Sequence, residues 1–588
     1  MSAELTSLGH QECLVTIAGE LRQMAHRLHI IISESNLLQE FLFEIATIYS
    51  NVAYLFVYVE GNERHIDYKP LLRERDRLFR NLELYSSVLH LMSRLNCPGP
   101  EAEEVRQIWM AWFQELAQAK GQDVDEKLEE AQQLAEHILY GIQEDQAKLL
   151  ERLGVNTGSA NPSAVFYRIV SETKKLDTRR KLAQAWNKQR DRRTGELADI
   201  LDQIVRVRRL KAKENGFSTV LEQTFERCSV SESDAHELIT AYLTQALASH
   251  SQLASNISNA TGCVDRPMDH FGHFVVSGLT RSHLPMFSLD TCLDFAFTIA
   301  DCVFNVSVTH IESENPHAVN VAVCSGGQSL GTICFDLLDT KHRHLSADRR
   351  LRFRTRSSTT DTIIKPAGHV LCRFQRGSDG THLITFESAH SIFHEFGHAL
   401  NHLLLRKRLP SQSGLDYLPV ERLEDLSSWF EKWVFHPDLA THLFLSSQDK
   451  EGLAQCQHVK MLEFHRTNLE RAVIAALDFD IHRRSEGGLR DSFEELKEQF
   501  AISDHCFLGD LLGHFTKPMV RANPGASFVY LWGASYGAQN FAPFSNLRLG
   551  DIQPSKQFDG RFSSCFDPEE PSTKPSMQAV FDFYSMVL

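Results

Sequence analysis

The sequence predicts a mainly helical protein that contains one small β-sheet, and two observations lead to this fold class. Apolar residues recur at helical spacing among charged residues through most of the 588-residue chain. Short β-branched or alternating runs, typical of strands, are confined to residues 305–374, and a strongly helical segment over residues 387–406 follows them. The hydrophobic fraction of 42% is ordinary for a folded globular chain.

The helical pattern is strong before residue 214 and again after residue 386. The segments that show it are residues 18–48, 70–95, 101–153, 174–213, 387–406, 420–435 and 459–482. A polar, turn-rich stretch over residues 156–162 separates the third segment from the fourth. We therefore expect an N-terminal helical region over residues 1–155 and a second region over residues 156–588.

The expected sheet is built from four short runs. They are residues 306–311, 320–324, 330–337 and 370–374. Gly326 and Gly327 separate the second run from the third and indicate a tight turn. The Ser/Thr/Asp-rich stretch over residues 357–361 is expected to be a loop.

The charge and hydropathy of the chain exclude several classes of partner. A formal net charge of −15 disfavours nucleic acid, because phosphate binding needs a basic surface. The most apolar stretch, residues 293–311, is interrupted by Asp294, Asp301 and Asn305, so no membrane-spanning helix is expected.

Residues 1–19 lack the pattern of a secretory signal, so a cytoplasmic location is expected. The sequence does not indicate the oligomeric state.

The segment His394-Glu395-Phe396-Gly397-His398 has the HExxH pattern of a zinc site on a helix. Two histidines four positions apart lie one turn apart on one helix face, so both imidazoles can reach one ion. The glutamate between them flanks the ion and can take a proton from a water that the metal activates. The motif predicts a soluble, zinc-dependent peptidase.

The residues around the motif support a buried helix. Its apolar residues form one stripe, made by Ile392, Phe396, Ala399 and Leu403. A glycine inside a helix costs about 1 kcal/mol. Gly397 is therefore expected where another segment packs closely against the helix.

A catalytic zinc ion usually takes three protein ligands. The segment after the motif offers Glu421, Glu424 and Asp425 as a third ligand. An acidic partner for a ligand histidine is also expected, and one of these carboxylates is a candidate for it. Spacing alone does not choose among the three.

A longer stretch around the motif, Phe393–His402 (FHEFGHALNH), resembles the signature of the thimet oligopeptidase and oligopeptidase F family of zinc metallopeptidases. Other stretches resemble the family in the same order along the chain. They are residues 206–217, 330–337, 366–386, 424–435, 530–532 and 575–581. The resemblance extends from near residue 200 to residue 588.

The resemblance implies a two-lobed helical fold with a deep substrate channel and with the small sheet near the zinc site. It implies one Zn2+ ion, a metal site within residues 387–435 and a substrate loop within residues 510–535. Glu424 matches the third ligand of the family. Its spacing from His394 is one residue longer than usual, so Glu421 stays an alternative.

The implied reaction is hydrolysis of a peptide bond in a short peptide, with Glu395 as general base. His514 and Tyr530 match the family's donors to the oxyanion. The strand that would pair with the substrate backbone is represented by Val370, Cys372 and Phe374.

The substrate loop departs from the family pattern. It is longer, and Ser527 and Phe528 replace paired tyrosines. Asn401 replaces a usual histidine. Arg521 and Lys517 are cations within the loop, and they either bind a substrate carboxylate or stay as exposed charges.

Three functions remain open on this reading. The first is a general peptidase of short peptides, and the second is an enzyme dedicated to one peptide of a biosynthetic pathway. The third is a non-catalytic peptide-binding protein that keeps the fold. The complete set of His394, Glu395 and His398 favours an enzyme, because a binding protein does not need the general base.

Overall fold

The computed structural model describes most of the chain after residue 121. The described residues are 122–155, 162–173, 175–261, 285–312, 318–338, 349–354, 357–358, 363–374, 382–405, 413–415, 418–502, 508–552 and 574–585. The helices expected over residues 18–48 and 70–95 lie outside them. The expected boundary near residue 155 stays a prediction.

The described residues belong to two compact units, each assembled from separate stretches of the chain. Unit 1 includes Asn305–Ser378 and Ala399–Tyr417. Unit 2 consists of Asp123–Phe304, Asp379–His398 and Leu418–Leu588. The division falls within one helix, directly after His398.

Unit 2 is helical, apart from a two-strand ladder of β1 (Phe287–Ser288) and β9 (Leu383–Ile384). Its longer helices are α7 (Gln122–Arg152), α8 (Pro162–Glu172), α9 (Leu176–Glu214), α11 (Glu232–Thr261), α13 (Leu289–Phe304), α17 (Ser447–Arg483), α18 (Leu489–Phe500), α21 (Val529–Phe541) and α24 (Met577–Ser585). Its shorter helices are α10 (Val220–Phe225), α15 (Asp425–Phe430), α16 (Asp438–His442), α19 (Leu508–Leu511) and α20 (Pro518–Ala522). The 3₁₀ turns are η5 (Val420–Arg422), η6 (Glu431–Phe435), η7 (Leu512–Thr516) and η8 (Leu549–Asp551). Helix α14 (Phe386–Leu404) contains the division between the units.

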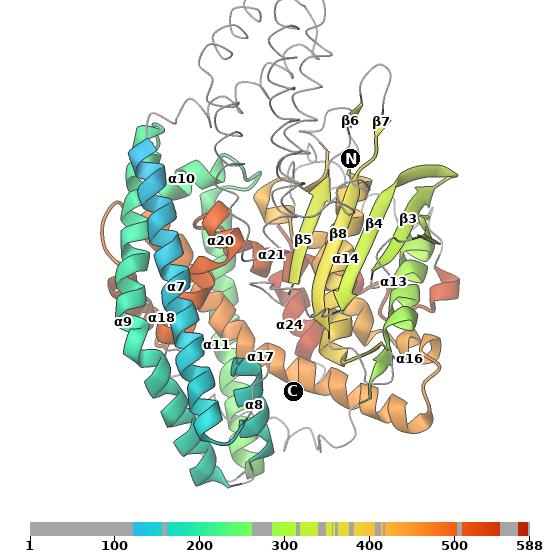
Figure 1. Ribbon diagram of the computed structural model, residues 1–588, viewed down its shortest axis with the longest axis horizontal. Coiled ribbons are helices and arrows are strands. Elements are labelled where there is room, and N and C mark those ends of the chain that lie inside the picture. Colours follow the sequence, from blue (N-terminus) through green and yellow to red (C-terminus); the bar gives the residue numbers. More distant parts are fainter. Residues whose placement is uncertain are drawn as a thin grey trace, which may run out of the picture. The chain divides into compact units, whose positions relative to one another are not determined.

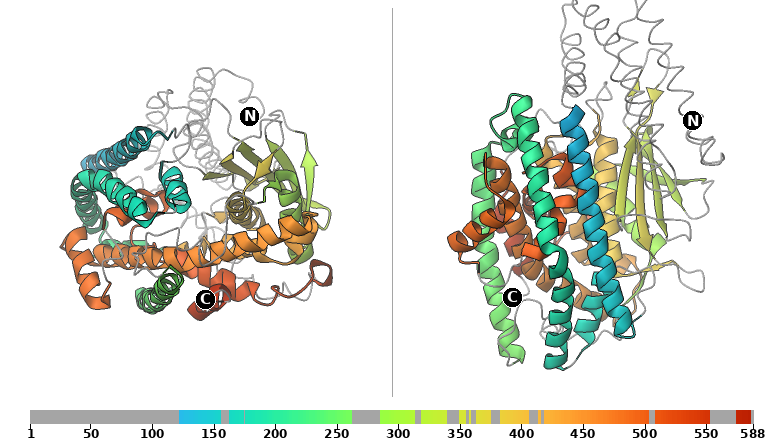
Figure 2. Two further views of the ribbon diagram at one scale, coloured as in Figure 1. Left: turned by 90° about the horizontal axis from the view of Figure 1, so that it is seen from below. Right: turned by 60° about the vertical axis from the view of Figure 1, so that its left-hand side comes forward.

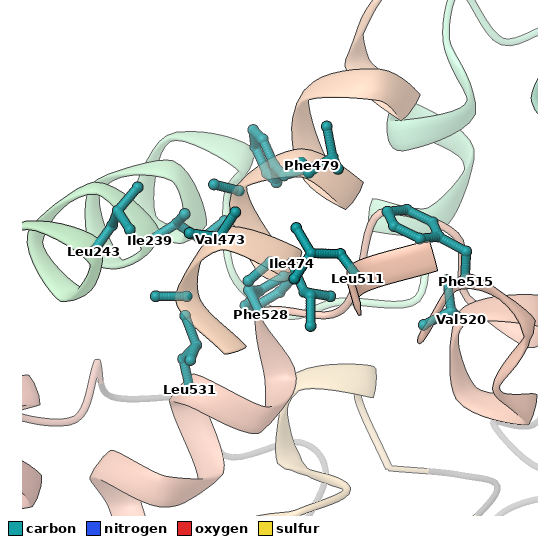
Figure 3. Close-up of a cluster of buried hydrophobic side chains, with 14 of the residues drawn as sticks. Ile239, Leu243, Val473, Ile474, Phe479, Leu511, Phe515, Val520, Phe528 and Leu531 are labelled. Carbon is teal, nitrogen blue, oxygen red and sulfur yellow. The ribbon is translucent and has the colours of Figure 1, made fainter. Parts of the chain in front are cut away.

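Helix α17 of unit 2 runs as one long helix (Figure 2) and contacts α9, α10, α11, α18, α21 and α24. It begins where the Ser446 hydroxyl accepts a hydrogen bond from the Asp449 N–H, which is a helix N-cap. Val473 and Ile474 of α17 pack with residues of α11 and with Phe528 and Leu531 near the start of α21 (Figure 3). This core holds the segment over residues 508–541 against α17.

Several helix predictions are confirmed and one is wrong. Helices α9 and α14 match the expected segments 174–213 and 387–406, and α17 contains the expected segment 459–482. The single helix expected over residues 420–435 is instead divided into η5, α15 and η6. The break falls at Glu424, whose φ of −100° and ψ of 2° are outside the helical region.

Unit 1 contains a five-stranded sheet with the strand order β2-β3-β4-β8-β5 (Figure 1). The strands are β2 (Ser307–Ile311), β3 (Val319–Ser325), β4 (Gln328–Leu338), β5 (Arg349–Arg354) and β8 (Ala367–Phe374). Only the β4–β8 pair is parallel. The four expected strands are confirmed, and the prediction of a mainly helical chain with a small sheet is correct.

The sequence predicts one tight turn and one loop within unit 1. Gly326 and Gly327 both have positive φ, 53° and 79°, and join β3 to β4 as expected. The stretch expected to be a loop at 357–361 begins with a short strand, β6 (Ser357–Ser358). That strand pairs with β7 (Ile363–Ile364).

Strand β8 lies between two other strands. Val370 is paired with Phe335 on β4 and with Leu351 on β5. Cys372 is opposite Arg349 of β5, and Phe374 is opposite Leu338 of β4. Val370 and Cys372 therefore do not pair with a substrate strand as expected, because neighbouring strands occupy this part of β8. Pairing at Phe374 stays a prediction.

None of the described helices is both long enough and apolar enough to span a bilayer.

Candidate metal centre

Helix α14 carries His394 and His398 on one face. Their ring centroids are 4.9 Å apart and the ring planes are nearly perpendicular, at 84°. The four residues of the expected apolar stripe are fully buried: Ile392, Phe396, Ala399 and Leu403. Phe396 packs edge-on against Phe297 of α13, with ring centroids 5.5 Å apart. The predicted arrangement of a buried stripe and a polar face is confirmed.

The close packing expected at Gly397 is present. A β-carbon added there would lie 2.6 Å from the Ser427 α-carbon and 3.0 Å from the Leu426 carbonyl oxygen. Both neighbours are backbone atoms of α15, which cannot retreat as the end of a flexible side chain would. A glycine at this position therefore allows α15 to approach the histidines.

The approach of α15 brings a carboxylate to both imidazoles. Oε2 of Glu424 lies 3.3 Å from Nε2 of His394 and 3.3 Å from Nε2 of His398. One potential ligand atom from each residue lies within 4.8 Å of the others. The Ser427 hydroxyl donates a hydrogen bond of 3.1 Å to the same Oε2. His394, His398 and Glu424, the three predicted ligands, therefore lie close enough together to bind one ion.

The other two acidic candidates, Glu421 and Asp425, lie outside this group of three. Glu421 is completely buried and accepts a hydrogen bond of 3.2 Å from the Ser229 N–H. Burial raises the pKa of Asp425 well above its usual value, although the charge of Arg422 acts in the opposite direction. Neither residue belongs to the group of potential ligand atoms found among the described residues.

The acidic partner of His394 is Glu431, at the start of η6. Nδ1 of His394 lies 2.9 Å from Oε2 of Glu431. An ionised carboxylate only accepts hydrogen bonds, so Nδ1 donates to Glu431 and Nε2 is the nitrogen that faces Glu424 and can bind a cation. The expectation that Glu421, Glu424 or Asp425 would fill this role is wrong. Glu431 lies in the same stretch of chain, seven positions after Glu424.

The electrostatics of this group favour a cation. Burial alone would raise the pKa of Glu424. The charge of His398 and the hydrogen bonds from both histidines outweigh burial, so the pKa of Glu424 lies well below its usual value. Burial alone would lower the pKa of His394, but its hydrogen bonds to Glu424 and Glu431 and their charges raise it to about 10. A positive charge between these groups is therefore stabilised.

The donor set fits zinc. Two imidazole nitrogens and one carboxylate oxygen form the usual protein ligand set of a catalytic zinc ion, which leaves a position for water. The three candidate ligand side chains are only 10–19% exposed, so the site is shielded from bulk solvent. The hydrogen bond from His394 to Glu431 matches the outer support that zinc-binding histidines usually have.

Glu395 directly follows His394 on α14 and is 7% exposed. Successive helical residues are rotated by about 100°, so Glu395 lies beside the face that bears the two histidines. Its role as general base stays a prediction.

The two expected oxyanion donors lie on separate elements of unit 2. His514 is in η7, where burial lowers its pKa to about 3 and the charges of Lys517 and Arg471 act in the same direction. A neutral imidazole can still donate one N–H. Tyr530 is in the first turn of α21, three positions before Gly533, which faces Glu424. Both roles stay predictions.

Arg521 lies in α20 and is bound to α7. Its guanidinium pairs with the Glu136 carboxylate and donates a hydrogen bond of 2.9 Å to the Gln132 side chain. Lys517, the other loop cation, is exposed. The expected contact between Arg521 and a substrate carboxylate stays a prediction.

The altered substrate loop has an anchor that sequence reasoning missed. Asp478 of α17 is fully buried and accepts hydrogen bonds from the Gly525 N–H at 3.1 Å, the Ser527 N–H at 3.0 Å and the Ser527 hydroxyl at 2.6 Å. His482 Nδ1 lies 3.0 Å from the same carboxylate. Ser527, which replaces a tyrosine of the family pattern, therefore binds inward to α17.

Known proteins resemble this chain in sequence and in fold. The organellar oligopeptidase A of Arabidopsis thaliana (chloroplastic/mitochondrial) is 22% identical over 395 residues, which are 62% of this chain and 50% of that protein. Oligopeptidase A of Escherichia coli (strain K12) is 23% identical over 243 residues, 38% of this chain and 36% of that protein. The matched part is thus half or less of each relative's length. A solved structure of PZ peptidase A with an inhibitor has a similar fold, with a TM-score of 0.60, 12% identity and 97% of both chains covered.

A family match extends over residues 169–542, which is more than half of the chain. It includes the two histidines of α14, Glu424 and the loop expected to bind substrate. The family resemblance and the mainly helical fold predicted from the sequence are therefore confirmed. This chain belongs to Peptidase family M3.

Proposed function

We propose that the protein is a zinc-dependent metallopeptidase that hydrolyses peptide bonds in short peptides. The observation that supports this most strongly is the convergence of His394, His398 and Glu424 directly beside Glu395. Two nitrogen ligands, one carboxylate and an adjacent carboxylate base form the set that metal-assisted hydrolysis needs.

In this proposal His394, His398 and Glu424 hold one Zn2+ ion. The ion supplies Lewis-acid activation of a water molecule and polarisation of the scissile carbonyl group. Glu395 takes a proton as the water oxygen attacks the carbonyl carbon. The C–N bond then breaks, and Glu395 delivers the proton to the departing amine. His514 and Tyr530 would donate hydrogen bonds to the developing oxyanion.

The altered loop favours a second candidate, an enzyme dedicated to one peptide. Ser527 is hydrogen-bonded to Asp478 and does not supply the donor that a tyrosine supplies in the family pattern. A loop with fewer outward donors selects its substrates through other contacts. A narrow range of cleaved peptides would distinguish this candidate from a general oligopeptidase.

A cytoplasmic location belongs to the same proposal. It follows from the lack of a secretory pattern in residues 1–19 and is tested by imaging the tagged chain in cells.

The decisive experiment compares the wild-type protein with the Glu395→Gln variant. Metal content is measured by elemental analysis, and both proteins are incubated with a mixed library of short peptides read by mass spectrometry. We expect about one zinc ion in each protein, because Glu395 is not a ligand, and cleavage only by the wild type. A wild-type protein that holds zinc and cleaves no peptide would favour a binding role. Equal cleavage by both proteins would exclude Glu395 as the base.

A further inference from the structure

Lys432 directly follows the acidic partner of His394 and is 1% exposed. Its ammonium nitrogen lies 2.7 Å from Oε1 of Glu431 and donates a hydrogen bond of 3.0 Å to the hydroxyl of Tyr584. A buried ion pair seldom stabilises a protein more than apolar side chains of the same volume. Stability alone therefore does not explain a lysine at this position.

Tyr584, in the last turn of α24, is fixed from three sides. Its ring stacks on that of Phe464 of α17, with centroids 3.8 Å apart and planes 9° apart. Its carbonyl oxygen lies 3.1 Å from Nε2 of His465. The rings of Phe583 and Tyr584 both face the ammonium group of Lys432, at 5.7 Å and 5.2 Å. Helix α24 thus holds the lysine in one place.

The Glu431 carboxylate divides its two oxygens between two hydrogen-bonding neighbours, and Nε2 of His390 lies further away, 3.9 Å from Oε2. Oε1 accepts a hydrogen bond from the Lys432 ammonium group, and Oε2 accepts one from Nδ1 of His394. The carboxylate cannot rotate about its terminal bond without breaking one of these contacts. The orientation of the His394 ring therefore depends on Lys432 and, through Lys432, on Tyr584.

We propose that Lys432 and Tyr584 are positioning residues of the metal centre, through which the C-terminal helix α24 helps to hold the cation. Tyr584 orients Lys432, Lys432 orients Glu431, and Glu431 orients the ring of His394 toward the ion. This inference rests on the proposed function, because it requires that His394 binds a metal.

The test uses the full-length chain with the substitutions Lys432→Met and Tyr584→Phe. Tyr242→Phe is a matched control, because Tyr242 is also fully buried in the unit 2 core and its hydroxyl donates one hydrogen bond of 2.8 Å, to Asn468. The dissociation constant of Zn2+ is measured by competition with a chromophoric chelator. The difference in melting temperature between the zinc-loaded and zinc-free forms is measured separately.

We expect Lys432→Met to raise the zinc dissociation constant about tenfold, within the range seen when outer support of a ligand histidine is removed. Tyr584→Phe should raise it about threefold, since one neutral hydrogen bond that acts indirectly is lost. Tyr584→Phe should have no further effect in the Lys432→Met background, because Tyr584 acts through Lys432. Tyr242→Phe should lower both melting temperatures equally and leave the dissociation constant unchanged.

Zinc affinities of Lys432→Met and Tyr584→Phe equal to that of the wild type would overturn the inference. If Lys432→Met does not fold, the comparison of Tyr584→Phe with Tyr242→Phe decides alone, and equal zinc affinities in that pair would overturn it. A wild-type protein that binds no zinc would instead overturn the proposed function together with this inference.

Discussion

Gly533 of α21 faces Glu424 so closely that an added β-carbon would lie 2.5 Å from the β-carbon of Glu424. A β-carbon added at Gly537, one turn later, would lie 2.6 Å from the Ser428 carbonyl carbon. With Gly397 on the opposite side, these glycines leave room for α15 between α14 and α21. The position of the third candidate ligand is therefore set by two neighbouring helices.

The substitution Gly533→Ala should weaken zinc binding more than Gly537→Ala. Both add a methyl group against the backbone of α15 and should lower the free energy of unfolding by about 1–3 kcal/mol. Only Gly533 is in contact with Glu424 itself. The measurements are the chemical denaturation of each zinc-free variant and its zinc dissociation constant. An equal loss of zinc affinity in the two variants would show that displacement of α15 as a whole is responsible.

The choice between Glu424 and Glu421 as third ligand can be tested directly. Glu424→Gln should abolish stoichiometric zinc binding, because an amide oxygen is a poor ligand and carries no charge. Glu421→Gln should keep the zinc and lose about 1–3 kcal/mol of stability, because the buried hydrogen bonds with Ser229 are weakened. Elemental analysis after gel filtration gives the metal content of each variant. The reverse result would identify Glu421 as the ligand.

The Asp478→Asn substitution should destabilise the zinc-free protein by about 3 kcal/mol at pH 7, because it removes a buried charge that receives several donors. Burial alone would raise the pKa of Asp478, but hydrogen bonds from His482 and Ser527 lower it below its usual value. A depressed pKa stabilises the folded state fully above the unfolded value, which is about 3.9, and this contribution is lost progressively as the pH falls from there through the lower, folded pKa.

The difference in unfolding free energy between wild type and Asp478→Asn should therefore be constant near neutral pH and shrink only as the pH is lowered below about 4. Asp480→Asn is the control. Asp480 lies on the same helix and pairs with Arg484, which is 32% exposed. A partly exposed ion pair contributes about 0.5–1 kcal/mol, so this variant should lose less stability. A pH-independent difference for Asp478→Asn would contradict the assignment.

Arg521 can bind a peptide carboxylate only when its guanidinium is released from the ion pair with Glu136. Arg521→Gln is expected to raise KM for peptides with a free C-terminus more than for their amides. Glu136→Gln should lower KM for the free acids, because the guanidinium loses its internal partner. The measurement is a set of steady-state rates with paired acid and amide peptides. Equal changes for acids and amides would indicate that Arg521 only joins α20 to α7.

Much of the fold could be predicted because its signals are local. Helices α9 and α14 and the strands β2, β3, β4 and β8 each have a periodicity that lies within one segment. The break at Glu424 could not be predicted, because apolar residues continue at helical spacing through residues 420–435. The break depends on the fit of α15 between two helices that are distant from it in the sequence.

In the candidate site, too, only the residues that lie close together in the sequence could be predicted from a local pattern. His394 and His398 belong to one helix, so their spacing alone brings them together. Glu424 needed a family comparison to distinguish it from Glu421. The link from Lys432 to Tyr584 joins residues 152 positions apart, and no local pattern connects them. In the sequence, Lys432 is indistinguishable from a surface charge.

The shortness of α15 has a consequence for the order in which the protein matures. A helix of six residues is not stable on its own, so α15 forms only when its neighbours are present. The ribosome releases both histidines of α14 more than a hundred residues before it releases Gly533, the residue against which Glu424 rests. A nascent chain therefore offers a metal ion two nitrogen ligands but no properly placed carboxylate. If this site binds a metal, tight capture is therefore a late event, reached only after Gly533 has been synthesised and α21 has folded against Glu424.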